Sequence, residues 1–405
     1  MSHARPEPDV PPTASGQIPT PREDGQGRQG PGEREAPGAT GQDSEGTELP
    51  PSAQPQPGPE PEPGPPRTQP LPSLVAAVVF GVLCLGGLGY TLLNFTGAIR
   101  VFTAEAVASV LMLAVVGVIG FWILRRIRPV RPPNLAFSLL ALVWGMTGAV
   151  GLALYANTQL GSAWSRAGGL EFGSLWGAAL TAPINEELLK VTGVVLIAVI
   201  APRAVRGPVD GFVAGSLVGL GFQLVEDLTY ALNMISMQGA TAGMVSVVQS
   251  FFARVVLTGL GSHWAMSAVA GTAIGLLAAT AWRPGTRRAV GALLLLLLAM
   301  GLHWLFDAPL LQSLLGILVK VLAVFVSALA VYLAVRHAYR GRVRRALAEE
   351  GEELGIRRSS AVALASRHGR RGELSRVAHP ERPAVRARQE QMVAAAEERA
   401  SEYRG

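Results

Sequence analysis

Eight apolar runs of about 20 residues recur between residues 73 and 340, and they constrain the fold more than any other feature of this sequence. The runs cover residues 73–93, 102–124, 135–156, 174–200, 209–235, 256–281, 288–311 and 314–338. A helix of about 20 apolar residues crosses a hydrocarbon layer of ~30 Å. Unpaired strand edges are not tolerated in lipid, so helices are the only suitable assignment. The sequence therefore predicts an all-α polytopic membrane protein with about eight transmembrane helices.

Composition divides the chain into a membrane region and two tails. The whole chain is 49% hydrophobic and only 16% charged, whereas soluble domains carry about 25% charged residues. Residues 1–72 hold 19 of the 29 prolines and eleven carboxylates against five arginines, with no apolar run. We expect them to form a disordered, Pro-rich, acidic cytoplasmic tail. Residues 73–340 form the predicted eight-helix transmembrane domain, and residues 341–405 form a charged cytoplasmic tail that is partly helical.

Arginines in the short loops predict the orientation of the chain. The loops after the second, fourth and sixth runs carry Arg125, Arg126, Arg128 and Arg131, then Arg203 and Arg206, then Arg283, Arg287 and Arg288. The loops on the opposite side carry Arg100, Arg166 and Arg254, one apiece. We expect the chain to lie in the cell membrane with its arginine-rich side, and therefore both termini, in the cytoplasm. Because the arginines flank apolar runs, we expect them to contact a lipid bilayer and not nucleic acid. Arginine far outnumbers lysine, which suggests a GC-rich bacterial genome.

Ionisable side chains inside the runs indicate a functional site. Residues 73–340 contain only eight carboxylates; Glu105, Glu171 and Asp210 lie at the ends of runs, where water is available, and the other five lie inside runs. The internal groups are Glu186, Glu187, Glu226, Asp227 and Asp307, together with Lys190, His263 and His303. Each such group near a helix centre costs roughly 2.5–3.5 kcal/mol on insertion scales, so several together cost on the order of 10 kcal/mol. A cost of this size favours a functional origin for the cluster.

The fourth run combines two adjacent carboxylates with a lysine. Glu186 and Lys190 are four residues apart and share a helix face, and Glu187 is three residues from Lys190. Two neighbouring carboxylates at low dielectric cannot both ionise cheaply, so one becomes suited to act as a base on water. The alternative is a buried ion pair that fixes helix register, although a pair would need only one glutamate.

The next three runs each add a candidate. Phe222 precedes Glu226 by one helical turn, which indicates packing more than chemistry. His263 lies in the sixth run beside small residues that allow helices to approach closely. His303 precedes Asp307 by four residues, so the Asp307 carboxylate can accept the second ring N–H. A lone membrane histidine is often a satisfied interior group, but two on consecutive helices favour a shared site.

Two chemistries remain open for such a site. Glu226, His263 and His303 are a donor set that suits Zn²⁺, with a further glutamate as general base. Without a metal ion, Glu186 or Glu187 could activate water directly while the histidines stabilise the oxyanion.

The ordered motifs resemble those of the PrsW family. They are Glu186-Glu187-x-x-Lys190, Phe222-x-x-x-Glu226, the His263 run with its serine and glycine pattern, and His303-x-x-x-Asp307. The family comprises polytopic intramembrane proteases, more distantly similar to the CAAX prenyl-protease and bacteriocin-processing superfamily. By motif the resemblance covers about residues 174–310.

The resemblance implies an endopeptidase that cleaves a membrane-anchored protein, with an anti-sigma factor as the best-known type of substrate. It implies that Glu186 and Glu187 are the catalytic carboxylates, that Glu226, His263 and His303 complete the site, and that Lys190, Phe222 and Asp307 support it. Two rival hypotheses are a proton- or ion-coupled transporter, since intramembrane Glu, His and Lys also form proton relays, and a non-catalytic membrane scaffold. No paired interrupted helices related by an internal repeat support transport.

Overall fold

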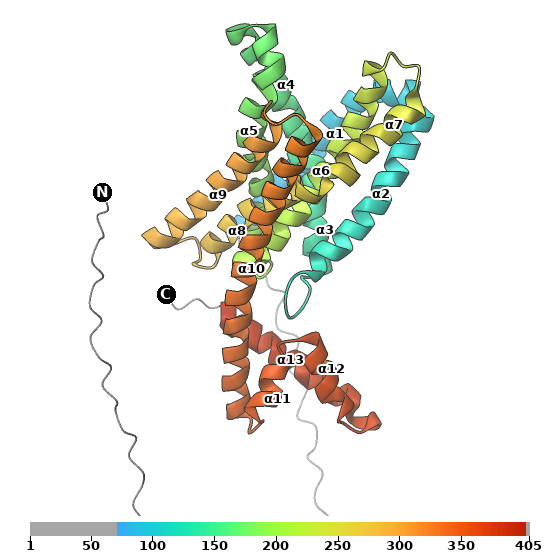
Figure 1. The fold of residues 1–405 in the computed structure, drawn as a ribbon. Coiled ribbons are helices and arrows are strands. Elements are labelled where there is room, and N and C mark those ends of the chain that lie inside the picture. The colour runs from blue at the N-terminus through green and yellow to red at the C-terminus, as the bar shows by residue number, and fades with distance from the viewer. Residues whose placement is uncertain (1–70, 402–405) are drawn as a thin grey trace, which may run out of the picture. The chain divides into compact units, whose positions relative to one another are not determined.

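Every regular element is a helix in residues 71–401, the part of the chain that the computed structural model describes (Figure 1). This confirms the all-α prediction. The predicted disordered tail, residues 1–72, lies outside the described residues except for Leu71 and Pro72, which begin the first helix.

The long helices occupy the positions of the apolar runs. They are α1 (Leu71–Val101), α2 (Thr103–Arg126), α3 (Leu135–Trp144), α4 (Val150–Gly168), α5 (Leu170–Ile200), α6 (Pro208–Met237), α8 (His263–Ala278), α9 (Thr286–Asp307) and α10 (Leu314–Glu353). A π-helical turn, η1 (Gly145–Ala149), joins α3 to α4 into one continuous rod. The remaining helices are α7 (Gly243–Phe251), η2 (Phe252–Leu257), η3 (Gly259–Gly261), α11 (Arg358–Ala363), α12 (Arg367–Ser375), η4 (His379–Glu381) and α13 (Arg382–Ser401).

Seven helical segments among the described residues are long and apolar enough to cross a membrane. They are α1, α2, the α3–α4 rod, α6, η3 with α8, α9 and α10. The fourth expected span, α5, has 31 residues but is not among them. Its apolar sequence is interrupted by Glu186, Glu187 and Lys190. The three ionisable residues within five positions, and not the length of the helix, distinguish α5 from the seven segments.

The structure moves one predicted boundary. The sixth run was expected to begin at residue 256, but the segment Gly243–Leu257 forms its own short apolar helix. A turn follows, and α8 begins at His263. His263 is therefore the first residue of a helix.

Glycines bring α6 and α8 into close contact. A Cβ atom placed on Gly211, Gly215 or Gly219 would lie 2.2, 2.1 and 2.4 Å, respectively, from a backbone oxygen of α8. Small residues allow such approach between membrane helices, where close packing is a main driving force. This contact sets the distance between the α6 carboxylates and the α8 histidine.

Replacement of Gly215 by valine is expected to separate α6 from α8. The added side chain collides with the Ser267 carbonyl, so we expect a loss of at least about 2 kcal/mol in the free energy of unfolding. The matched control is Gly89→Val in α1, where nothing lies within 4 Å of an added Cβ. Unfolding in detergent, followed by circular dichroism, measures both. Equal stability of the two variants would contradict the close contact.

The C-terminal helices pack on the extension of α10. Beyond its apolar part, α10 contributes Val343 and Leu347 to an apolar cluster with Val393 and Ala396 of α13. A buried arginine, Arg128, ties this cluster to the membrane helices, because its guanidinium contacts carboxylates from two other elements.

Arg128 bonds three side chains. It donates from Nε to Asp210 at 2.6 Å, from Nη1 to Glu397 at 2.7 Å and from Nη2 to the Tyr339 hydroxyl at 3.0 Å. The bonds connect the α2–α3 loop with α6, α10 and α13, so the docking of α13 depends on ionised carboxylates.

Docking of α13 is expected to weaken in acid. Burial by itself raises the pKa of the Glu397 carboxyl, but Arg128, the Tyr339 hydroxyl and Arg131 outweigh burial and hold this pKa below its usual value. A lowered folded pKa means that the carboxylate stabilises the docked state above about pH 4.3 and loses this effect as the pH falls through the lowered value. Hydrogen exchange of α13, corrected for its intrinsic pH dependence, measures the loss, which Glu397→Gln should abolish. Protection of α13 that stays constant on acidification would contradict the prediction.

Candidate functional site

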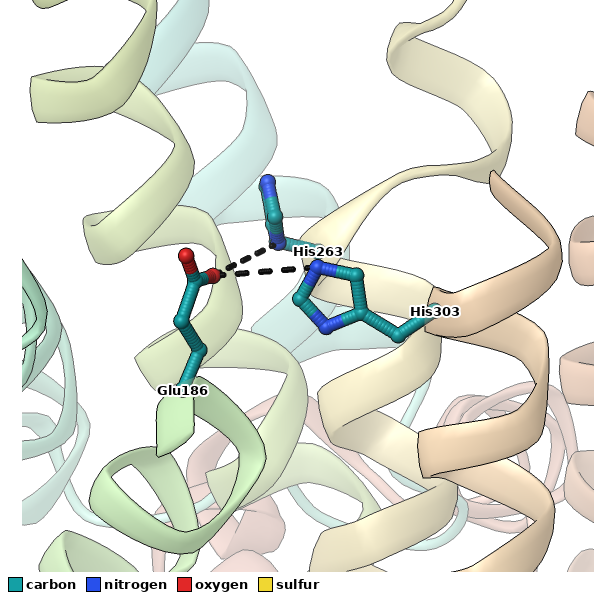
Figure 2. Close-up of side chains that lie close together, drawn as sticks. All are labelled: Glu186, His263 and His303. Atoms are coloured by element: carbon teal, nitrogen blue, oxygen red, sulfur yellow. Dashed lines mark ion pairs between the residues drawn. The ribbon is translucent and has the colours of Figure 1, made fainter. Parts of the chain in front are cut away.

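Three ionisable side chains from three helices meet inside the bundle. Figure 2 shows Glu186 of α5 facing His263 of α8 and His303 of α9. Glu186 Oε2 lies 3.9 Å from His263 Nδ1 and 3.7 Å from His303 Nε2. The three side chains are almost fully buried, with 2%, 3% and 1% of their surface exposed. The fold therefore brings together groups that are 117 residues apart in the chain.

Lys190 lies at the centre of this group. Its Nζ is 3.2 Å from Glu186 Oε2, 2.9 Å from Glu187 Oε1 and 2.9 Å from His263 Nδ1. A protonated lysine can only donate, so His263 Nδ1 is the acceptor and the ring proton is on Nε2. The lysine thus determines the histidine tautomer.

Glu187 contacts His303 from the side away from Glu186. Its Oε1 lies 3.0 Å from His303 Nδ1, and its Oε2 accepts a bond from Ser267 at 3.4 Å. Asp307, one turn after His303, lies 3.4 Å from His303 Nε2. Asp307 therefore contacts His303, but at the nitrogen that also faces Glu186, and the carboxylate at the second ring nitrogen is Glu187 and not the predicted Asp307.

Glu226 is held by an arginine that sequence analysis did not place in the site. Arg254 of η2 forms an ion pair with Glu226 and bonds Asp227 Oδ1 at 2.7 Å. Glu226 Oε2 also lies 2.6 Å from His263 Nε2, which agrees with a proton on that nitrogen. From the sequence, Arg254 lies in the loop between the fifth and sixth runs, where it indicates only the topology of the chain.

Asn157 of α4 is a second residue that sequence analysis missed. Its Nδ2 donates to Glu186 Oε1 at 2.9 Å, and its Oδ1 accepts from Asn185 at 2.8 Å. The only sequence signal was an amide at the end of an apolar run, which is weak. Asn157 orients the Glu186 carboxylate so that its other oxygen faces the histidines.

The donor set fits a metal ion. One donor atom from each of Glu186, His263 and His303 lies within 4.8 Å of the others. The metal ligands predicted from the sequence included Glu226 in place of Glu186. In the structure, Glu226 forms an ion pair with Arg254 instead. The Lys190 ammonium contacts two of the three donor atoms, so an ion and this ammonium compete for the same position.

The charge of the cluster also favours a cation. Its five carboxylates are Glu186, Glu187, Glu226, Asp227 and Asp307, and its permanently positive side chains are Lys190 and Arg254. With both histidines neutral, the formal charge of these linked groups is −3. Uncompensated charge is costly in a medium of low dielectric constant. A divalent cation or bound protons would reduce this cost.

A cavity of about 290 Å³ reaches the cluster. Glu186, Glu226, His263 and Asp307 line it, together with small residues of α4 and α5. A second hollow of about 820 Å³ shares Asn157, Gly161 and Gly173 with it, and extends along the α4–α5 hairpin. The two hollows therefore adjoin, and together they lead from the α4–α5 hairpin to the buried group.

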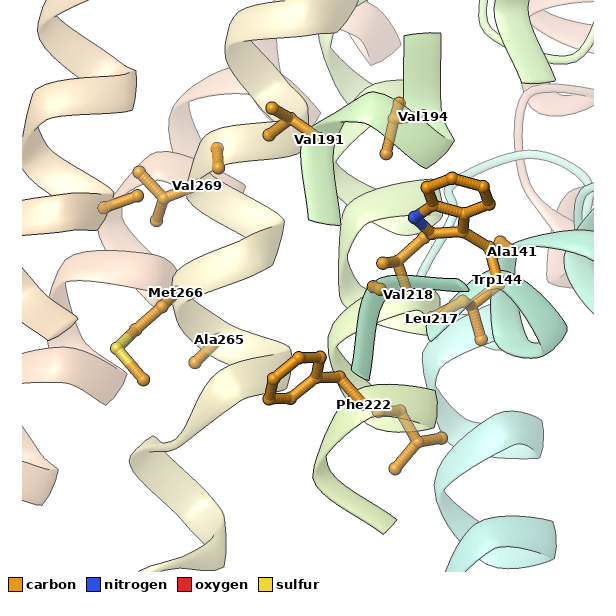
Figure 3. Close-up of a cluster of buried hydrophobic side chains, with 14 of the residues drawn as sticks. Ala141, Trp144, Val191, Val194, Leu217, Val218, Phe222, Ala265, Met266 and Val269 are labelled. Carbon is orange, nitrogen blue, oxygen red and sulfur yellow. The ribbon is translucent and has the colours of Figure 1, made fainter. Parts of the chain in front are cut away.

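Apolar packing encloses the other side of the cluster. The Phe222 ring centroid lies 5.1 Å from that of His263 and 4.0 Å from Lys190 Nζ, which places the ammonium over the ring face. Figure 3 shows Phe222 within the core that also contains Trp144, Leu217 and Met266. Phe222 therefore packs against both His263 and Lys190, which are hydrogen-bonded to each other, as expected for a supporting residue.

Comparison with protein families gives a match to a family of membrane proteases. The family described as PrsW family intramembrane metalloprotease matches residues 133–335, from the turn before α3 into α10. The matched part contains each ionisable residue of the cluster described above. Comparisons with curated proteins and with solved structures give no match.

Proposed function

This chain belongs to the PrsW family of intramembrane metalloproteases, and we propose that it hydrolyses a peptide bond of a membrane-anchored protein at the group formed by Glu186, His263 and His303. The family assignment confirms the resemblance, the membrane location and the protease class. The observation that carries the proposal is that three helices bring a carboxylate and two imidazoles together at the end of a polar cavity.

Glu186, His263 and His303 are proposed to hold the metal ion, which we assign as Zn²⁺. Zinc there would supply Lewis-acid activation of water and of the peptide carbonyl. Glu187 would hold His303 through Nδ1, and Glu226 would hold His263 through Nε2, so each imidazole keeps its other nitrogen toward Glu186. Such outer contacts orient metal-binding histidines.

Asp307 is proposed to be the general base and acid, which transfers the proton of the attacking water to the leaving amine. It lines the cavity, and its side chain is 20% exposed. Glu186 and Glu226 line the same cavity but are bonded to Lys190 and Arg254, respectively. Asp307 is therefore the cavity carboxylate best suited to take a proton from water and return it to the leaving amine.

The polar route along the α4–α5 hairpin is proposed to receive an extended segment of the substrate. A single-span protein such as an anti-sigma factor, cleaved in the plasma membrane near its outer face, would fit the family and the arginine distribution. Small residues line the route, so a polypeptide backbone can approach Glu186 closely.

Replacement of Gly177 by leucine is expected to obstruct this route. Gly177 lines the cavity, and nothing lies within 4 Å of an added Cβ, so the new side chain would fill empty space. We expect at least a roughly tenfold fall in kcat/KM with unchanged unfolding temperature and metal content. The control is Gly86→Leu on the exposed face of α1. Full activity of the Gly177 variant would exclude this route.

The direct test uses purified full-length protein in liposomes with a single-span substrate. We expect cleavage, one bound zinc ion per chain by elemental analysis, loss of activity with a chelator, and recovery with zinc. Full activity of a metal-free preparation would reject the metal assignment. Absence of cleavage across a panel of single-span substrates, despite bound metal, would reject the proposed substrate class.

A further inference from the structure

A third cavity, of about 670 Å³, lies at the arginine-rich end of the bundle. The α2–α3 loop, the α5–α6 loop and helices α12 and α13 line it. It shares no lining residue with the cavity that reaches Glu186. The proposed protease chemistry therefore gives no account of it.

Five arginines line this third cavity. They are Arg128, Arg131, Arg203, Arg206 and Arg370. Only three carboxylates accompany them, so the lining carries a formal charge of +2. The arginines come from three separate segments of the chain, and the fold gathers them around one space.

Two of the five arginines already form hydrogen bonds within the protein, and two of the lining carboxylates, Asp210 and Glu397, accept some of these bonds. The Arg128 guanidinium donates hydrogen bonds to Asp210, Glu397 and the Tyr339 hydroxyl. Arg370 donates to the backbone carbonyls of Leu364 and Val130. These two arginines therefore build the cavity wall and have little capacity for a ligand.

Arg203 and Arg206 have guanidinium N–H groups that are available to bind a ligand. The Arg206 Nε is buried without a hydrogen bond, and Asp210 Oδ2 lies 3.7 Å away from it, beyond bonding distance. The Arg203 side chain is 82% exposed, and its nearest carboxylate, Glu398, is 4.0 Å away. A buried guanidinium donor without a partner is costly unless a ligand satisfies it.

The rest of the lining suits an amphiphilic anion. Asn134 caps the start of α3, so the positive end of that helix dipole faces the cavity. Pro132, Pro133 and Phe137 supply an apolar wall beside the first turn of α3. Basic cavities at the cytoplasmic ends of membrane helices suit anionic headgroups.

We propose that this cavity binds a phosphate group, with Arg203 and Arg206 as its principal donors. Guanidinium groups bind phosphate oxygens in a planar, bidentate geometry. The phosphate belongs to a lipid headgroup or to a soluble phosphate compound, which share this chemistry. Because the cavity joins two membrane loops to α12 and α13, an occupied cavity holds the C-terminal helices against the bundle.

The test uses purified full-length protein in detergent at constant ionic strength. One arm titrates short-chain phosphatidylglycerol, with short-chain phosphatidylcholine as reference, and the other titrates inorganic phosphate against chloride. Native mass spectrometry counts bound lipid, and the unfolding temperature reports phosphate binding. The variants are Arg203→Gln alone and Arg203→Gln with Arg206→Gln. The matched control is Arg287→Gln, an exposed arginine at the same end but outside the cavity.

We expect one equivalent of ligand, a roughly tenfold weaker affinity in the single variant and a larger loss in the double variant. The control should retain wild-type affinity. Binding of phosphatidylglycerol but not phosphate assigns a headgroup, and binding of both with the same variant dependence assigns a general phosphate site. Absence of binding in both arms, or an equal loss in Arg287→Gln, overturns the proposal. Arg203 is largely exposed, so its variant stays informative if the double variant does not fold.

Discussion

Glu186→Gln is expected to abolish peptide-bond hydrolysis, lowering kcat/KM by at least about a thousandfold. Glutamine keeps the shape of the side chain but removes the negative charge that faces His263 and His303. It removes the anionic donor for a metal ion, and it equally removes a carboxylate that would activate water without one. The loss is therefore expected under either chemistry.

Three measurements accompany this variant. Cleavage of a single-span substrate gives kcat/KM, elemental analysis gives zinc per chain, and the unfolding temperature shows that the fold is retained. The matched control is Glu349→Gln in the C-terminal part of α10, where the carboxylate is exposed and lines neither hollow of the site. If the Glu186 variant cleaved within tenfold of wild type while folded, the cluster would not be the active site.

Lys190→Met is expected to give the largest loss of stability. The ammonium contacts Glu186 and Glu187, and all three side chains are essentially buried. Removal of one partner from a buried ion pair leaves uncompensated charge and costs about 3–5 kcal/mol. We therefore expect a fall of this size in the free energy of unfolding, measured by denaturant titration in detergent micelles.

The chain contains one other lysine, which provides the control. Lys320 is also buried but donates only to the backbone carbonyls of Phe306 and Ala308. Lys320→Met should cost about 1–3 kcal/mol, as expected for an unpaired buried acceptor. In the double variant Lys190→Met with Glu187→Gln, one buried charge is removed along with its partner, and stability should partly recover. Additive losses in that double variant would contradict direct coupling of the two groups.

Much of the fold followed from the apolar runs, and the exceptions have physical causes. Length and hydropathy located a helix at each of the eight runs, because crossing a membrane requires both. The start of α8 was misplaced because the short helix Gly243–Leu257 is also apolar, and hydropathy alone does not separate it from a span. That segment also carries Arg254, so the error hid a residue of the candidate site.

The sequence predicted which residues belong to the candidate site, but it did not predict which of them contact each other. Sequence analysis selected Glu186, Glu226, His263 and His303, because each is a costly group inside an apolar run. It grouped Glu226 with the two histidines as metal donors. The structure places Glu186 there, since Arg254 forms an ion pair with Glu226. Residue spacing along a single helix contains no information about such contacts between helices.

The sequence by itself determined the class of structure, the order of the helices and the set of buried ionisable groups, because these depend on local composition and on the cost of charge in lipid. Only the tertiary structure decided which carboxylate faces the two imidazoles and where the arginines of separate loops meet. Both depend on how closely the helices approach and how each is rotated about its axis. In this chain that geometry is set by contacts such as those of Gly215 with α8, between residues distant in sequence.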